Sequence, residues 1–297
     1  CGFGRASGQA HMTRFDRIAV VDWSASSAPP KKSPQADAIW IGQANARGVV
    51  TTYHPNRHMA EQAIVALIAQ TRAAGESLLI GVDFALGYPA GFAPRLTGQA
   101  QARAVWRWLA AQITDSPANL NNRFAVADAI NGQFGGQGPF WGHPNGQSFA
   151  HLTPRKTVDY ATLGLAERRW VERLVPRAQP VWKLFTTGAV GGQSLMGQPM
   201  IHRLATQHRA SVWPFEAASA VTLAEVYPSL LAPAVTAALG PASIKDEVQV
   251  RLLAQALWQV GQSGDLAGML AEAPAAVRAE EGWILGATAA ATLLAAL

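Results

Sequence analysis

Cysteine is almost absent from the 297-residue sequence, which contains only Cys1. Residues 1–12 have no periodicity and end in a His-Met pair before a patterned segment, which is typical of an expression-tag remnant ahead of a native start at Met12. Without that remnant the chain has no cysteine. This excludes a disulfide framework, a zinc ribbon and a thiol nucleophile, so any metal ion would bind to oxygen or imidazole.

Charged residues are also scarce, at 14% of the chain. Lys and Arg number 24 against 19 Asp and Glu, which gives a net charge of only +5. A non-specific nucleic-acid-binding protein normally has a stronger basic surface. The densest basic group is more typical of a solvated helix face than of a nucleic-acid track, and comprises Arg155, Lys156, Arg168, Arg169, Arg173 and Arg177.

Long apolar segments are missing as well. The longest weakly polar run, Trp283–Leu297, is too short to span a bilayer, which requires about 20 helical residues, and no segment resembles a signal peptide. We therefore expect a cytoplasmic protein without a membrane partner. The 49% of hydrophobic residues is enough for a large core, and we expect a single domain over residues 13–297.

The first part of the chain has the pattern of alternating strands and helices that is typical of an α/β fold. Apolar runs that end in an acid predict buried strands, and a polar turn between two runs predicts a hairpin. The predicted strands are 17–22, 38–43, 48–53 and 77–83, and the predicted helices are 59–74 and 99–113.

The pattern changes after residue 113. Residues 119–151 are rich in Asn, Gly and aromatics without a sustained period, which is typical of a functional loop or insertion. A helix at 160–174, a strand at 181–185 and a helix near 200–208 are predicted next, so we expect an insertion at about 114–215. The core then resumes with a strand at 221–227 and a helix at 245–260.

Four carboxylates lie at the ends of these core elements: Asp22, Asp83, Glu225 and Asp246. In a five-stranded sheet of order 3-2-1-4-5, the ends of the first and fourth strands are neighbours, so Asp22 and Asp83 would meet. Two like charges at that distance are costly unless a cation neutralises them. Oxygen ligands of this kind suit Mg²⁺ or Mn²⁺, with one or two ions bound.

Five short motifs in this order resemble a family of predicted nucleases of RNase H-like fold, the domain of unknown function 429. They are Val-Asp-Trp-Ser-Ala from Val21, Gly-Val-Asp-Phe-Ala-Leu-Gly from Gly81, Glu-Val-Tyr-Pro-Ser from Glu225, Ile-Lys-Asp-Glu from Ile244 and Glu-Gly-Trp-Ile from Glu281. The resemblance extends over about residues 16–287. It implies a mixed sheet flanked by helices, with a large helical and loop insertion.

The resemblance also implies roles for the acids. Asp22 would bridge two metal ions, Asp83 and Asp246 would each hold one, and Glu225 would be a ligand or orient a water molecule. Gln249 stands where related nucleases have a second carboxylate on the closing helix, so the second ion is the less secure part of this assignment. A single strand-end Asp is more often a cap or a loop anchor than a ligand.

A glycine-rich segment, Thr186–Gly197, follows the predicted strand at 181–185. Its amide groups could form an anion-binding loop, although it lacks the Gly-Lys-Ser/Thr of a Walker motif, and a tight structural loop would have the same composition. The predicted phosphate contacts of this region are Thr187, Gly188, Gly191 and Gly192, with Lys183 and Arg203 as charge partners.

Three further residues are candidates for substrate contact. Ser24 could donate to a phosphate, His143 could transfer a proton or bind a metal, and Trp141 could stack on a base. Each has a structural alternative, because Ser24 is a common turn residue and the two aromatic residues could belong to a buried lid.

These patterns favour a divalent-metal-dependent hydrolase of phosphodiesters or phosphate esters. The mild net charge points to a short nucleic acid or a small phosphorylated substrate, and no obligate protein partner is evident. One alternative is an actin-like or sugar-kinase-type nucleotide-binding protein, since these proteins share this topology, and here the segment Thr187–Gly192 would bind the nucleotide. Some chains that resemble this one carry a molybdopterin guanine dinucleotide synthesis label, which would also imply nucleotide binding. A non-catalytic scaffold that binds through residues 119–151 is the other.

Overall fold

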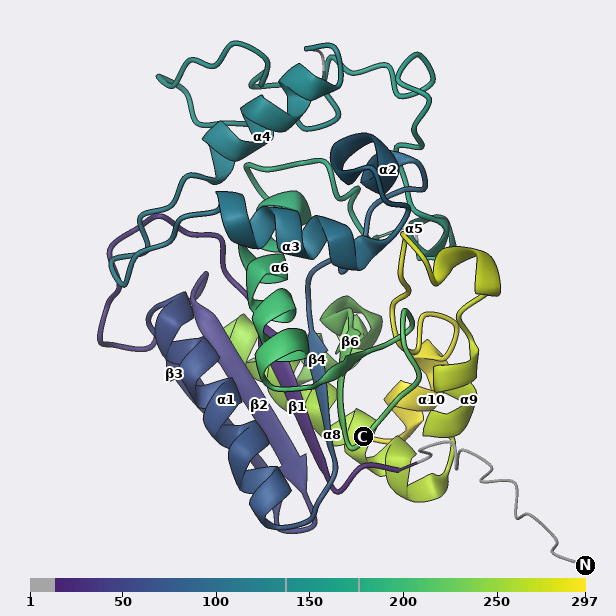
Figure 1. The fold of residues 1–297 in the computed structure, drawn as a ribbon. Helices are drawn as coiled ribbons and strands as arrows, with labels where there is room; N and C mark the ends of the chain where they lie inside the picture. Colours follow the sequence, from purple (N-terminus) through teal and green to yellow (C-terminus); the bar gives the residue numbers. More distant parts are fainter. Residues whose placement is uncertain (1–13, 137, 176) are drawn as a thin grey trace, which may run out of the picture.

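A six-stranded mixed sheet forms the centre of the chain in a computed structural model that describes residues 14–136, 138–175 and 177–297 (Figure 1). The predicted tag remnant, residues 1–12, lies outside the described residues. The strand order is β3-β2-β1-β4-β6-β5. The strands are β1 (Arg17–Asp22), β2 (Ile39–Asn45), β3 (Gly48–His54), β4 (Leu78–Val82), β5 (Ser211–Val212) and β6 (Val221–Glu225).

The sheet confirms the predicted α/β class and the order of its main strands. β1, β2 and β3 form an antiparallel meander, whereas β1, β4, β6 and β5 run parallel to their neighbours. The predicted fifth strand is β6, and the two-residue β5 adds an edge that the sequence did not predict. The arrangement is consistent with an RNase H-like sheet.

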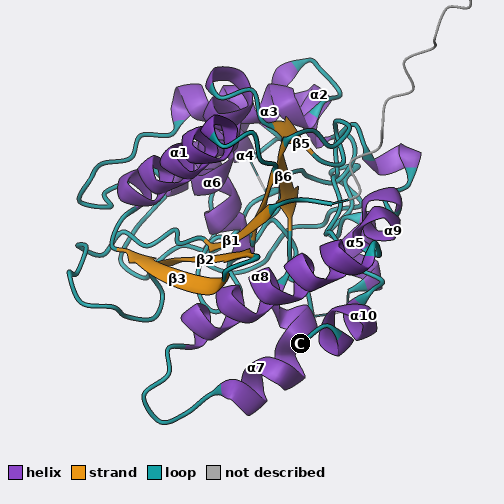
Figure 2. Ribbon diagram, turned by 90° about the horizontal axis from the view of Figure 1, so that it is seen from below, coloured by secondary structure: helices purple, strands orange, loops and turns teal. Residues whose placement is uncertain are grey.

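Helices cover both faces of the sheet (Figure 2). Alternate residues of β1 point to opposite faces: Ile18 and Val20 join the core under α8, whereas Ala19 and Val21 join the core under α1 and α6. The helices are α1 (Arg57–Ala73), α2 (Phe92–Thr97), α3 (Ala102–Gln112), α4 (Arg123–Gln133), α5 (Trp170–Leu174), α6 (Val190–Gln207), α7 (Ala232–Ala238), α8 (Lys245–Ser263), α9 (Leu266–Ala271) and α10 (Ala290–Ala295), with 3₁₀ turns at Pro228–Leu231 and Ala275–Val277.

A third core lies beyond the sheet, at the top of Figure 1, and is built on aromatic rings. Trp182 stacks on Tyr88, with 5.4 Å between ring centroids, and meets Phe92 and Phe140 edge-on at 5.2 and 5.4 Å. Residues before and after position 114, where the insertion was predicted to begin, contribute to this aromatic core. Among the described residues, no helix is long and apolar enough to cross a membrane.

Several predicted elements of the insertion were wrong. The helix predicted at 160–174 is present only as α5, and residues 181–185 form a turn rather than a strand. α4 lies within the region that was predicted as loop. Residues 181–185 and α4 contribute to the aromatic core, whereas α5 contributes Val171 to the core under α8. The hydrophobic residues of these segments therefore indicated burial but not helical or strand periodicity.

The glycine-rich segment is the largest difference, because α6 begins at Val190 and includes most of it. A Cβ at Gly191 would lie 2.2 Å from the carbonyl oxygen of Val181, and a Cβ at Gly197 would lie 2.2 Å from the ring of Phe84. These glycines therefore allow α6 to pack directly on backbone and on an aromatic ring. At positions 191 and 197, glycine therefore reflects close helix packing, whereas Gly188 lies before the helix.

Candidate functional site

A cleft of about 850 Å³ opens at the carboxyl ends of the parallel strands. Its walls come from the segment after β1, the turn after residue 184, the start of α6 and the start of α8. In open α/β sheets, ligands bind at this edge because the strand ends and the helix N-termini meet there. The cleft contains all four of the predicted acids: Asp22, Asp83, Glu225 and Asp246.

The strand register brings Asp22 and Asp83 together. β1 and β4 are parallel with Val21 opposite Val82, so the next residues along, Asp22 and Asp83, are level with each other. The amide N–H of Asp83 donates to the carbonyl oxygen of Val21 at 3.2 Å, so the hydrogen bonding between β1 and β4 extends to Asp22 and Asp83. The N–H of Trp23 donates to Oδ1 of Asp83 at 2.8 Å and holds that carboxylate in place.

The two carboxyl groups are electrostatically coupled. Burial and the charge of Asp83 raise the pKa of Asp22 well above its ordinary value. Burial also raises the pKa of Asp83, to about 6, although hydrogen bonds from Asp22 and from the N–H of Trp23 oppose the increase. Both pKa values are shifted in the direction expected when two neighbouring acids cannot both ionise.

Two further acids surround this pair. Asp246 lies at the start of α8, where Oδ2 accepts the N–H of Asp37 at 2.9 Å, and burial raises its pKa. Asp37 also lines the cleft and was not predicted. A signal for it existed, because β2 is antiparallel to β1, so the residues just before β2 must lie beside the carboxyl end of β1.

The carboxylates of Asp22 and Asp83 suit a magnesium ion as ligands. Mg²⁺ is usually bound by one or two carboxylates, with water and substrate phosphate completing its shell, and the pair at Asp22 and Asp83 matches that chemistry. Among the described residues, no three His, Cys, Asp or Glu side chains converge tightly enough to hold an ion. The direct coordination predicted for Asp246 is therefore not assembled in this structure, and its role stays a prediction.

Glu225 lies in the cleft but does not join the acid pair. It is in register with Val82, one residue before Asp83, so its side chain points to the opposite face of the sheet. There Arg169 donates to Oε1 from Nη2 at 2.6 Å and to Oε2 from Nη1 at 2.7 Å. Glu225 also accepts the N–H of Leu86 at 3.1 Å. Its side chain is thus occupied by an ion pair.

Arg169 is the residue that sequence analysis missed at this end of the cleft. It is buried and also pairs with Glu172, from Nε to Oε1 at 2.8 Å. The two carboxylates outweigh the cost of burial and raise the pKa of Arg169 above its ordinary value. The sequence placed Arg169 in a basic run, and nothing in that run distinguishes a buried arginine from an exposed one.

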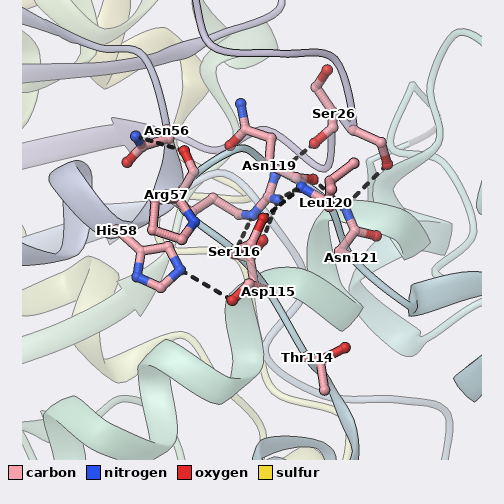
Figure 3. Close-up of polar contacts among 12 residues, drawn as sticks. Ser26, Asn56, Arg57, His58, Thr114, Asp115, Ser116, Asn119, Leu120 and Asn121 are labelled. Carbon is pink, nitrogen blue, oxygen red and sulfur yellow. Dashed lines mark hydrogen bonds and ion pairs between the residues drawn. The ribbon is translucent and has the colours of Figure 1, made fainter.

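Ser24 follows the acid pair in a segment that a buried arginine holds (Figure 3). Nη1 of Arg57 donates to the carbonyl oxygens of Ser24 at 3.1 Å and Ser26 at 2.8 Å, while Nε and Nη2 bind both carboxylate oxygens of Asp115 at 2.6 Å. The hydroxyl of Ser24 donates to the carbonyl oxygen of Asp37 at 2.9 Å. Ser24 lines the cleft with its hydroxyl already engaged.

The structure divides the predicted phosphate contacts. Thr187 and Gly188 line the cleft, whereas Gly191 and Gly192 pack against backbone. Lys183 donates from Nζ to the carbonyl oxygen of Thr187 at 2.7 Å. Arg203 forms a two-pronged ion pair with Glu61, with both N–O distances at 2.6 Å, and it does not line the cleft.

His143 and Trp141 also lie away from the cleft. His143 is buried, with Nδ1 3.0 Å from the carbonyl oxygen of Pro144 and its ring edge-on to Phe149. Trp141 forms single bridges to Thr153 and Lys183. The side chain of His143 and the backbone of Trp141 thus make contacts within the predicted insertion.

The fold is assigned from the topology of the sheet, because the comparisons with known proteins found no match. No family model matches the chain, no curated protein matches it, and no solved structure matches it. The strand order, with an antiparallel meander joined to parallel strands, is consistent with RNase H-like and actin-like sheets.

Proposed function

We propose that this protein is a divalent-cation-dependent hydrolase of phosphate esters, with Asp22 and Asp83 as the ligands of the cation. The observation that carries the proposal is the acid pair at the carboxyl ends of β1 and β4. Such a pair is electrostatically costly in the absence of a cation, and it lies in an open cleft rather than in the core. Membership of the family of predicted nucleases belongs to the same proposal.

The surrounding residues have supporting roles. The N–H of Trp23 orients the carboxylate of Asp83, and Asp246, fixed by the N–H of Asp37, adds negative charge that strengthens cation binding. A bound Mg²⁺ or Mn²⁺ would polarise the phosphoryl group and activate a water molecule. In this proposal Glu225 is a structural partner of Arg169 rather than a ligand.

The nucleotide-binding alternative loses one of its supports. It placed the phosphates of the nucleotide on the glycine-rich segment Thr187–Gly192, but Val190 onward is helical and the glycines at 191 and 192 are packed. Titration with ATP and with inorganic triphosphate in the presence of Mg²⁺ separates the two functions, because a nucleotide-binding protein would bind ATP more tightly than triphosphate and the proposed hydrolase would not.

The test is hydrolysis of a phosphomonoester, a phosphodiester and short single-stranded and duplex nucleic acids, with Mg²⁺ or Mn²⁺. We expect cation-dependent hydrolysis of at least one substrate. Asp22→Asn and Asp83→Asn should each lower the rate by about 100-fold or more, because each removes a charged ligand from the cation.

Asp159→Asn is the matched control, because Asp159 is an exposed carboxylate that does not line the cleft. Its rate should equal that of the unchanged protein. Activity that survives in both Asp22→Asn and Asp83→Asn, or activity that persists in EDTA, would refute the proposal.

A further inference from the structure

Arg123 is a buried cation without a carboxylate partner in the wall of the cleft. Its side chain is 6% exposed, and among the described residues it forms no ion pair. Nη1 donates to the hydroxyl of Ser27 at 2.8 Å and to Oδ1 of Asn121 at 2.7 Å, whereas Nε has no hydrogen-bond partner. A buried guanidinium normally satisfies its donors, and here Nη2 also has no hydrogen-bond partner among the described residues, so Arg123 has N–H groups left to bind an anion.

The start of α6 lies next to this arginine. A Cβ built on Gly192, in the first turn, would be 3.7 Å from Nε of Arg123. The N-cap residue, Ala189, provides no side-chain cap, and no acceptor within the described chain binds the N–H of Gly188 or Val190. The 18-residue helix therefore presents free amide donors, and the positive end of its dipole, to the cleft.

Lys183 orients one of these amides. Its Nζ binds the carbonyl oxygen of Thr187, and the C=O and N–H of a trans peptide point in opposite directions. The N–H of Gly188 thus points away from Lys183, which does not line the cleft, while Gly188 does. Gly188 has φ +75°, a conformation that glycine adopts without strain.

From these contacts we infer that Arg123 and the start of α6 form a subsite for a terminal phosphate group of the substrate. The subsite adjoins the acid pair, since Gln193 in the first turn donates to the carbonyl oxygen of Trp23, the residue after Asp22. The identification of the phosphate as part of a substrate rests on the proposed hydrolase function. Binding of the phosphate itself does not.

The donors favour a monoester over a diester. Nη2 of Arg123, which has no hydrogen-bond partner among the described residues, and the two free amides can bind three oxygens, and a phosphomonoester has three terminal oxygens and a charge near −2. A diester has two such oxygens and one negative charge. Burial lowers the pKa of Arg123 to about 10, so the guanidinium still carries its charge at neutral pH.

The first experiment uses the unchanged protein in EDTA, labelled with ¹⁵N-glycine. Addition of inorganic phosphate should shift the amide resonance of Gly188 and leave that of Gly75, at the far end of β4, unchanged. Dimethyl phosphate, the diester probe, should bind at least tenfold more weakly. No shift at Gly188, or equal affinity for the two probes, would overturn the inference.

The second experiment measures phosphate affinity by calorimetry in variants whose folding is checked by circular dichroism. We expect Arg123→Gln to weaken binding at least tenfold and Arg123→Lys to have an intermediate effect. Arg203→Gln is the matched control: Arg203 lies on α6, but the Glu61 pair occupies it, so this variant should bind phosphate normally. Equal losses in the Arg123 and Arg203 variants, or none in Arg123→Gln, would overturn the inference.

The two proposals can fail separately. Phosphate binding that persists in Asp83→Asn, in a protein without cation-dependent hydrolysis, would leave the subsite standing and refute the hydrolase. Cation-dependent hydrolysis in a protein whose phosphate affinity does not change in Arg123→Gln would refute the subsite alone.

Discussion

At the scale of single residues, the acid pair is the feature with the clearest chemical consequence. Asp22 and Asp83 share a hydrogen bond, and the pKa of each is raised above its ordinary value. The pair therefore takes up protons on folding in the absence of a cation. Proton uptake links the pair to stability, and cation binding should replace the protons that it holds.

A pH-dependent stability follows for the metal-free protein. The folded pKa of Asp83 is about 6 and the ordinary value is 3.8, so the folded chain binds more protons between these values and loses stability as the pH rises through them. Asp83→Asn removes this loss. The free energy of unfolding of the variant minus that of the unchanged protein should therefore be larger at pH 8 than at pH 5, by about 1–2 kcal/mol. Urea unfolding in EDTA measures the difference.

Mn²⁺ provides the control for this prediction. At pH 8 the ion should raise the melting temperature of the unchanged protein and have no effect on Asp83→Asn, because the variant lacks one of the two ligands. A variant whose stability has the same pH dependence as the unchanged protein would show that the pair does not titrate as described.

At the scale of elements, Arg57 connects the start of α1 to the segment that follows the acid pair. The arginine is 3% exposed and satisfies its donors with Asp115 and with the carbonyl oxygens of Ser24, Ser26 and Asn119 (Figure 3). Loops between a strand and a hairpin are usually mobile. Here a planar guanidinium holds the loop over the cleft, and a lysine could not reproduce its five donors.

Arg57→Lys is therefore expected to be costly. Breaking the buried pair with Asp115 should lower the free energy of unfolding by about 2–4 kcal/mol and increase hydrogen exchange in residues 24–28. Arg203→Lys makes the same change in a more exposed pair, with Glu61, where the cost should be about 1 kcal/mol or less. Similar costs at the two positions would argue against this role for Arg57.

At the scale of the whole molecule, Arg169 joins three distant parts of the chain. From the start of α5 it binds Glu172 in its own helix, Glu225 at the end of β6, and the carbonyl oxygen of Glu281 at 3.0 Å. The carboxylate of Glu281 in turn accepts the N–H of Trp170 at 2.6 Å. These contacts join α5, which lies in the insertion, to the end of β6 and to the segment around Glu281.

Arg169→Met should break that coupling and leave the two carboxylates buried without a counter-ion. We expect a loss of about 3–5 kcal/mol in the free energy of unfolding. In the unchanged protein, far-ultraviolet circular dichroism and tryptophan fluorescence should report one coincident transition, and in the variant the two should separate. Coincident transitions in the variant would show that the two parts are coupled by other contacts.

The strand-end acids could be predicted because their positions depend on the sequence of residues within each strand. An apolar run that ends in an acid identifies β1 and β4, and the parallel register of neighbouring strands then places Asp22 beside Asp83. The hairpin and the helix before β4 were predictable for the same reason. The position of Glu225 was not, since a shift of one residue along β6 changes the face of the sheet to which its side chain points.

Residue composition and strand pattern were thus enough to establish the α/β class, the order of the main strands and the location of the acid pair. The tertiary structure alone showed that Gly191 lies in a packed helix, that Arg203 is paired with Glu61, and that Arg123 is a buried cation of the cleft wall with no ion pair among the described residues. The physical reason is that periodicity reflects contacts within an element, whereas the burial and pairing of an arginine depend on partners far away in the chain.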